Sequence, residues 1–366
     1  MSDAFGRSQL IVSKNLSVSG ERPSRPGRGH RLLSSVAEAI VRRLRTFTEQ
    51  TSVDVQWPRA LRALALARAA ETGDKNTLSR LIEYADTLLT PEGRWRTQLE
   101  SAPQALDGYN LLILHRIAPS ERYETAIRAM ASHFLNDCPR LGGCLPYSRS
   151  GNLMLVDTLG MLCPFLAAFG RDFKDEQAIH LAKTQLQDFI DRNLDPSSHL
   201  PFHGYFAGGP YRLGAHAWGR GVGWYMLGLV DTLIELDPAE KGYAELKHAL
   251  SQTAQALQGF QRADGNWGWA IVLPETRSDT SVASFCGYAL ARARHADLIS
   301  ADHDHMIAHA LAALEAASEP DGTVGNSSGE CRGLTDYSRS FGPQPWVQGT
   351  AAAFVIEMQK QPHNIH

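Results

Sequence analysis

Residues 214–231 read GAHAWGRGVGWYMLGLVD, and the two halves of this stretch differ in character. The second half, from Trp224 to Asp231, has the apolar and small residues of an ordinary buried helix. The first half places four glycines, two tryptophans, an arginine and a histidine in eleven positions. Glycine lowers helix stability by about 1 kcal/mol relative to alanine, so this start must serve a purpose beyond the helix itself.

Apolar residues recur at helical spacing along most of the chain after residue 30, and long alternating strand patterns are absent. The spacing predicts twelve helices, at residues 32–50, 57–71, 75–89, 104–117, 121–135, 155–169, 175–192, 217–236, 241–261, 279–296, 303–318 and 346–360. Short glycine-containing turns, such as PEGRW from residue 91 and ADGNWGW from residue 263, follow the odd-numbered helices. The helices therefore come in pairs.

The even-numbered helices begin with polar and aromatic residues, where a plain core helix has its first apolar turn. These residues are Trp57, Asp107, Tyr109, Asp157, Trp218, Arg220, Trp224, Asp279, Thr280, Trp346 and Gln348. The odd-numbered helices are amphipathic with a charged face, as expected of an outer layer. Six inner and six outer helices predict an all-α fold, an (α/α)6 barrel, whose inner helices begin at one common mouth. An irregular helical solenoid is the alternative, but it would leave this clustering accidental.

Composition limits the classes of function. The chain has 366 residues, 43% of them hydrophobic, and a formal net charge of −3. Residues 1–30 are rich in Arg, Pro, Ser and Gly and predict a disordered tail, followed by a single catalytic domain over 31–366. The absence of a clustered basic face argues against nucleic acid as a partner, and the absence of an 18-residue apolar run argues against a membrane span. Five irregularly spaced cysteines without a CxxC pair predict reduced thiols in a cytoplasmic protein, with no metal site.

Two aspartates stand in otherwise apolar inner helices. Asp157 lies in NLMLVDTLGMLCPFLAAFG, and Asp107 lies in PQALDGYNLLILHRI, one helix pair earlier. Loss of water raises the pKa of a carboxylate toward the range of a general acid. Each aspartate could instead bind free backbone N–H groups at the helix start. Two such carboxylates at one mouth indicate an active site, whereas for Asp279 the helix cap is the preferred interpretation.

The loop before residue 214 adds candidate binding groups. His203 lies in LPFHGYFAGG, shortly before Trp218 and Arg220. Aromatic faces can stack on sugar rings, and the planar guanidinium of arginine suits a carboxylate. Gly223 and Gly228 are assigned to close helix packing.

Two further segments contain possible binding groups. Trp267 and Trp269 are predicted to brace their turn, with either one possible at the mouth. SSG at 327–329 and Arg332 lie in a long loop before the last helix, and such loops often carry binding groups.

These segments together resemble a known family. LPFHGY followed by HAWGRGVGWYMLGLVDTL is similar to the histidine–glycine loop and the WxRGxGWxxxxLVD helix of the unsaturated uronyl hydrolases, glycoside hydrolase families 88 and 105. NLMLVDTLGMLCPFLA and ALDGYNLLILHRI resemble the two aspartate helices of this family, and SDTSVASFCGYALARA resembles its ETSAxxxxAYAL segment. The match extends from about residue 57 to 360, and the tryptophan–arginine–glycine helix is its most specific part.

The resemblance implies an (α/α)6 barrel that removes a 4,5-unsaturated uronic acid from oligosaccharides by hydrating its vinyl ether double bond. Asp157 would be the general acid and base, and Asp107 would assist it or position the sugar. The implied substrate-binding residues are His203, Trp218, Arg220, Trp224, Tyr147, Tyr109, Trp57 and Trp346. The partner is an oligosaccharide with a terminal uronic acid, no cofactor is needed, and the enzyme is expected to be a monomer or homodimer.

The sequence also departs from the family. A histidine usually stands shortly before the catalytic aspartate, but here the segment reads GGCLPYSRSGN, which leaves Tyr147 or Arg149 to replace it. Thr158 and Gly160 stand where the family favours Gly or Asp and Tyr. Hydrolysis of saturated β-glucuronides by two carboxylates therefore stays open, as do a lyase or epimerase and a non-catalytic uronate-binding protein.

Overall fold

The computed structural model describes residues 34–46, 56–148, 151–209, 211–273 and 275–360. The tail predicted over residues 1–30 lies outside this range. Each of the twelve predicted helices is confirmed: α1 (Ser35–Thr46), α2 (Gln56–Ala70), α3 (Lys75–Leu88), α4 (Ala105–Ile117), α5 (Glu121–Ser132), α6 (Val156–Phe173), α7 (Glu176–Asn193), α8 (Gly219–Glu235), α9 (Tyr243–Phe260), α10 (Thr280–His295), α11 (Asp304–Ala316) and α12 (Pro345–Gln359). None of the described helices has the length and apolar character that a membrane span requires.

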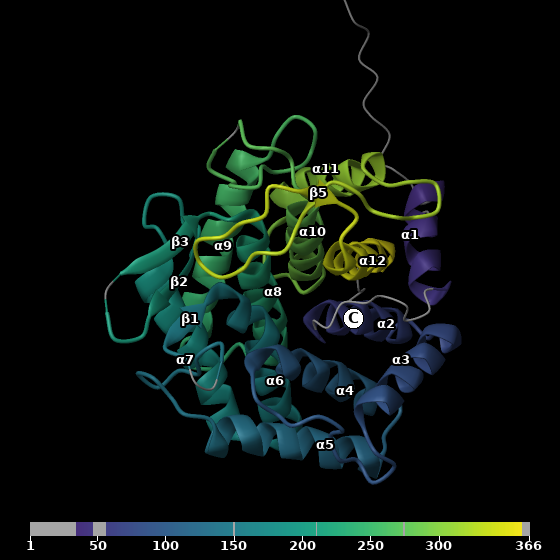
Figure 1. The fold of residues 1–366 in the computed structure, drawn as a ribbon, viewed down its shortest axis with the longest axis vertical. Helices are drawn as coiled ribbons and strands as arrows, with labels where there is room; N and C mark the ends of the chain where they lie inside the picture. The colour runs from purple at the N-terminus through teal and green to yellow at the C-terminus, as the bar shows by residue number, and fades with distance from the viewer. Residues whose placement is uncertain (1–33, 47–55, 149–150, 210, 274, 361–366) are drawn as a thin grey trace, which may run out of the picture. The chain divides into compact units, whose positions relative to one another are not determined.

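The even-numbered helices form the inner ring of the barrel. Each of them packs against the next, from α2 through α4, α6, α8, α10 and α12, and α12 returns to α2 (Figure 1). The odd-numbered helices lie outside this ring, with α7 against α6 and α11 against α10. Nearly every residue of α8 and α10 is buried. This arrangement confirms the predicted (α/α)6 barrel.

Glycines allow α8 to approach both of its neighbours in the ring. A Cβ atom at Gly223 would overlap the Cβ of Phe285 in α10, and a Cβ atom at Gly228 would overlap the backbone of Leu159 in α6. The predicted packing role of both glycines is therefore confirmed. Gly160 in α6 similarly leaves room for the ring and backbone of Trp224. Part of the unusual composition of 214–231 thus serves to close the inner ring.

Short strands, which the sequence did not predict, link the loops at the mouth of the barrel. Strands β1 (Leu153–Leu155), β2 (Phe202–Phe206) and β3 (Arg212–His216) form an antiparallel sheet in the order β1-β2-β3, and β4 (Ser327–Ser328) pairs with β5 (Phe341–Gly342). Leu155 pairs with Gly204, so the start of α6 lies beside the loop that follows α7. Strands of two to five residues are too short to show an alternating pattern in the sequence.

A buried polar network lies between the C-terminal halves of several inner helices, away from their N-terminal mouth. The fully buried Arg68 of α2 binds Asp231 of α8 at 3.1 Å, and Arg292 of α10 binds both Asp231 and Glu357 of α12. Removing one partner of such a buried pair leaves an uncompensated charge. The network therefore ties α2, α8, α10 and α12 together at the end of the barrel opposite the mouth.

Tyr109 of α4 belongs to this network, which corrects its predicted place in the substrate site. Its hydroxyl accepts a hydrogen bond from Arg68 at 2.8 Å and donates one to Glu235 at 3.2 Å. The side chain exposes no surface. Tyr109 lies one turn into its helix, and its long side chain extends toward the opposite end of the barrel, so a ligand at the mouth does not meet it.

Candidate active site

Asp157 and His203 meet at the mouth of the barrel. Asp157 lies in the first turn of α6, and the β1–β2 pairing brings His203 next to it. The His203 Nε2 atom lies 3.3 Å from the Asp157 Oδ2 atom, with side-chain exposures of 4% and 16%. The Asp157 Oδ2 atom has no aligned hydrogen bond among the described residues. This carboxylate oxygen is therefore held close to an imidazole nitrogen but not engaged by a hydrogen bond.

Arg220 connects this pair to the loop before α12. Its guanidinium lies between the rings of Trp218 and Trp346, 4.9 Å and 4.8 Å from their centroids. It donates hydrogen bonds to the carbonyl and hydroxyl oxygens of Ser328 and to the carbonyl of Gly329, at 3.0–3.1 Å. Burial lowers the pKa of Arg220, although Asp279 and Asp157 oppose that effect. Arg220 therefore anchors the loop, and its contact with a substrate carboxylate stays a prediction.

Three of the predicted tryptophans form one cluster. The rings of Trp57 and Trp346 stack at 5.2 Å, and Trp224 meets the edge of Trp57 at 5.7 Å. Trp57 is half-buried, Trp346 is buried, and Trp224 exposes no surface. The structure therefore corrects the prediction for Trp224: it packs behind Trp57 and against Phe285 instead of facing the mouth. Trp57, the most exposed of the three, and Trp346, which lines an adjoining cavity, are the rings that can contact a sugar.

Asp107 is placed differently from Asp157, although both lie in the first turn of an inner helix. The Asp107 side chain is completely buried, and it accepts hydrogen bonds of 2.6 Å from the Tyr84 hydroxyl and from the Gln56 side-chain amide. Burial raises the pKa of Asp107 to about 6, and the two hydrogen bonds oppose this rise. Gln56 begins α2 directly before Trp57. Asp107 therefore supports the residue that positions Trp57.

Tyr147 lies close enough to Asp157 for the two side chains to interact electrostatically, and its role in place of the family's histidine stays a prediction. Burial is the main reason why the pKa of Tyr147 is raised, and the charges of Asp157, Glu330 and Cys331 add to the effect. Glu330 and Cys331 belong to the loop between α11 and α12, so this loop reaches the same space. Arg149, the other candidate in that segment, lies outside the described residues.

The sequence did not single out Tyr337, although it contacts the site directly. Its hydroxyl lies 2.7 Å from the His203 Nδ1 atom, and its ring packs edge-on against Trp218 at 5.6 Å and Trp269 at 5.3 Å. Tyr337 lies in LTDYSRSFG, within the loop before α12 and outside every helix pattern. The only signals were the length of that loop and its one tyrosine.

The other aromatic and capping residues agree with their predicted alternatives. Trp267 is buried and donates a hydrogen bond to the Leu257 carbonyl, so it braces its turn, whereas Trp269 contacts Tyr337 at the mouth. Asp279 caps α10 by accepting from the Ser281 amide at 2.9 Å. Its helix-cap assignment is confirmed. Within the described residues, no group of three His, Cys, Asp or Glu side chains is arranged to hold a metal ion.

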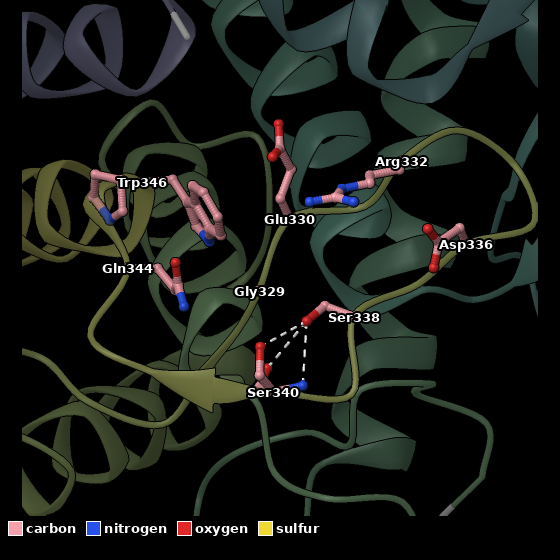
Figure 2. A pocket seen from close by; sticks show the side chains of 9 residues that line it. Gly329, Glu330, Arg332, Asp336, Ser338, Ser340, Gln344 and Trp346 are labelled. Atoms are coloured by element: carbon pink, nitrogen blue, oxygen red, sulfur yellow. Dashed lines mark hydrogen bonds between the residues drawn. The ribbon is translucent and has the colours of Figure 1, made fainter. Parts of the chain in front are cut away.

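A cavity of about 410 Å³ adjoins these residues, within the range of roughly 300–1,000 Å³ that is usual for small-ligand sites. It is lined by Gly329, Glu330, Arg332, Asp336, Ser338, Ser340, Gln344, Pro345 and Trp346. Figure 2 shows Arg332 and Trp346 on opposite sides of it, with Glu330 between them. Gly329 and Trp346 also contact Arg220. The cavity therefore shares a wall with the site formed by Asp157, His203 and Arg220.

Comparison with known proteins also indicates a glycoside hydrolase. The model of Glycosyl Hydrolase Family 88 matches residues 34–361. The chain is 25% identical over 350 residues to the unsaturated rhamnogalacturonyl hydrolase YesR of Bacillus subtilis, covering 90% of this chain and 95% of that protein.

Solved structures share the fold. A possible GH105 member from Salmonella enterica matches with a TM-score of 0.80 at 16% identity, covering 92% of this chain and 96% of that one. An unsaturated glucuronyl hydrolase from Bacillus sp. GL1, responsible for glycosaminoglycan degradation, matches with a TM-score of 0.66 at 15% identity, covering 87% and 94%. Because the family model spans nearly all described residues, the chain belongs to Glycosyl Hydrolase Family 88 and is a glycoside hydrolase.

Proposed function

We propose that this enzyme removes a 4,5-unsaturated uronic acid from the non-reducing end of lyase-generated oligosaccharides. The observation that carries the proposal is the Asp157 carboxylate, which lies beside His203 with one oxygen not engaged by a hydrogen bond. The family assignment and the names of the relatives, which act on unsaturated rhamnogalacturonyl and glucuronyl substrates, support it.

The proposed reaction needs a single carboxyl group. Protonated Asp157 gives its proton to C4 of the vinyl ether, and positive charge develops at C5. The Asp157 carboxylate then takes a proton from a water molecule as the water oxygen bonds to C5. The resulting hemiketal opens and releases the remaining sugar, and Asp157 is again protonated. The first turn of α6 places this carboxyl group at the mouth, where a substrate can reach it.

The burial of Asp107 favours this reaction over hydrolysis of a saturated glycoside. A conventional glycosidase uses two carboxyl groups that flank the bond to be cleaved. Asp107 exposes no surface, and both of its oxygens accept hydrogen bonds from protein side chains. We infer that Asp107 positions the site instead of contacting the scissile bond.

The deciding experiment follows the absorbance of the double bond. Purified enzyme is mixed with unsaturated disaccharides that lyases release from rhamnogalacturonan and from glycosaminoglycans, and in parallel with a saturated β-glucuronide. Loss of the unsaturated-uronate absorbance with release of the second sugar is the expected result for at least one unsaturated disaccharide. Release of sugar from the saturated glucuronide, with no reaction of any unsaturated substrate, would favour the two-carboxylate route.

We further propose that Arg332 binds the uronate carboxylate. Arg332 is the cation that lines the cavity, and within the described chain its guanidinium makes no hydrogen bond or ion pair. The guanidinium of Arg220, by contrast, is already bound to the loop. Replacement of Arg332 by alanine is expected to raise KM about ten-fold with kcat nearly unchanged, because it removes binding energy shared by substrate and transition state.

The matched control for Arg332→Ala is Arg339→Ala. Arg339 is an exposed arginine of the same loop that does not line the cavity, so its replacement should leave KM unchanged. Steady-state kinetics on the best unsaturated disaccharide measure both variants. An equal KM for wild type and Arg332→Ala would show that the carboxylate is bound elsewhere.

The cytoplasmic location and the monomeric or dimeric state predicted from the sequence remain proposals. Cell fractionation would test the location, and sedimentation experiments would test the oligomeric state.

A further inference from the structure

Tyr337, in the loop before α12, contacts the Nδ1 atom of His203. The Tyr337 hydroxyl lies 2.7 Å from the Nδ1 atom of His203, and the opposite ring nitrogen, Nε2, faces Asp157 at 3.3 Å. The same hydroxyl accepts a hydrogen bond of 2.8 Å from the backbone N–H of Ala215. One phenol oxygen therefore has two partners, and the proton on that oxygen has to be accounted for.

The donors and acceptors around the Tyr337 hydroxyl determine which ring nitrogen of His203 carries the proton. The Ala215 amide can only donate, so it occupies a lone pair of the Tyr337 oxygen. The Tyr337 hydroxyl keeps its own proton, because burial above all, with smaller contributions from Cys331 and Asp157, raises the pKa of Tyr337. Among the described residues, His203 Nδ1 is the acceptor within reach of that proton. A proton on Nδ1 would instead leave the Tyr337 O–H in a half-buried site without an acceptor.

We propose that Tyr337 is a positioning residue, which fixes His203 in the tautomer with its proton on Nε2. The inference rests on the proposed function for its catalytic meaning. In this tautomer the imidazole presents an N–H group to Asp157 and to the substrate. His203 then serves as a hydrogen-bond donor, and the transfer of protons to and from the substrate remains with Asp157. Which of the two ring nitrogens of a histidine carries the proton is commonly set by the hydrogen bond that the other nitrogen makes.

The backbone is built for this contact. Gly214 has a φ of +76°, and a Cβ atom there would lie 2.7 Å from both the His203 Cβ and the Tyr337 hydroxyl oxygen. Only glycine adopts this conformation without strain and leaves the required space. The Tyr337 ring packs against both Trp218 and Trp269. The first glycine of the stretch 214–231 thus makes room for the pair that supports the site.

Tyr337→Phe tests the proposal because it removes the hydroxyl and keeps the ring. The tautomer is read by NMR on the full chain labelled with 15N at both histidine ring nitrogens, and the His203 signals are identified by their absence from His203→Gln. We expect wild-type His203 to carry its proton on Nε2 and Tyr337→Phe to show a mixture of both tautomers. We also expect kcat to fall about ten- to a hundred-fold, with KM within about twofold.

Tyr211→Phe is the matched control, since Tyr211 is 70% exposed in the connection between β2 and β3. It should change neither the His203 signals nor kcat. A wild-type His203 with its proton on Nδ1, or a Tyr337→Phe variant with unchanged tautomer and unchanged kcat, would overturn the proposal. The NMR measurement needs no substrate. An Nε2 proton in an enzyme that hydrates no unsaturated uronide would support the role of Tyr337 while the proposed function failed.

Discussion

Replacement of Asp157 by asparagine is expected to lower kcat about a thousand-fold while sugar binding and folding persist. Asparagine has the same shape as aspartate, but it can neither give a proton to C4 nor accept one from water. General acid and base steps contribute roughly 10²- to 10⁴-fold each to enzyme rates, so the loss of one group that performs both has a large effect. The absorbance assay of the double bond measures kcat, and calorimetry with an unsaturated disaccharide measures binding.

The structure explains why Asp157→Asn should fold. Asparagine matches aspartate in size, and its amide oxygen can take the place of the Asp157 Oδ2 atom beside the His203 Nε2 atom. Asp175→Asn is a suitable control, because Asp175 caps the neighbouring outer helix α7 and should not affect kcat. If Asp157→Asn kept more than a tenth of wild-type kcat, the proton donor would have to be sought elsewhere at the mouth.

The fold could be predicted because its pattern is local. The inner helix α8 is buried over almost its whole length, whereas outer helices such as α7 alternate buried and exposed residues at helical spacing. Both patterns can be recognised within a window of about eighteen residues. The unusual helix starts added the ring order, because residues such as Trp57 and Trp218 gather only if alternate helices begin at the same end.

The site could be predicted only in part, because direction and long-range contact are not local properties. Asp107 and Asp157 have the same sequence context, yet one is fully buried and the other is 16% exposed. The difference comes from Tyr84 and Gln56 of the preceding helices, which cover Asp107 alone. Tyr109 likewise lies close to a helix start, but its side chain extends to the opposite end of the barrel.

The long loop before α12 was the least predictable part. Tyr337 reaches His203 across 134 positions of sequence, and Arg220 reaches Ser328 across 108. Neither contact has a spacing that a helix or strand would impose. A loop rich in serine and glycine offers no apolar periodicity, so its path over the mouth follows from tertiary contacts such as the Arg220 hydrogen bonds.

Asp107→Asn is expected to stabilise the protein above pH 7 by up to about 3 kcal/mol while lowering kcat/KM at least ten-fold. Burial raises the pKa of Asp107 from its ordinary 3.8 to about 6, and one pKa unit corresponds to about 1.4 kcal/mol. Because the pKa of Asp107 is higher in the folded state than in the unfolded chain, folding is more favourable at low pH, where the buried carboxyl group is neutral, than at high pH, where it is ionised. That contribution is complete below about pH 4 and is lost as the pH rises through 6. Asparagine stays neutral throughout.

The sign of this effect can be tested by urea unfolding between pH 4 and 8. The gain of Asp107→Asn over wild type should grow with pH and level off above about pH 7. Tyr84→Phe provides an internal check: it removes a hydrogen bond that lowers the pKa of Asp107, so the loss of stability should extend to higher pH when Asp107 is present but not in the Asp107→Asn background. A gain that is equal at pH 4 and pH 8 would contradict the titration of Asp107.

Opposite changes in stability and activity would separate a functional carboxyl group from a structural one. If Asp107 had only a structural role, its replacement would weaken the fold and the activity together. A gain in stability with a loss of activity means instead that the folded enzyme retains a buried carboxyl group at an energetic cost, as is common in active sites. Asp107 binds Gln56, which directly precedes Trp57 in α2, so we propose that this cost serves to position the Trp57 ring for the sugar.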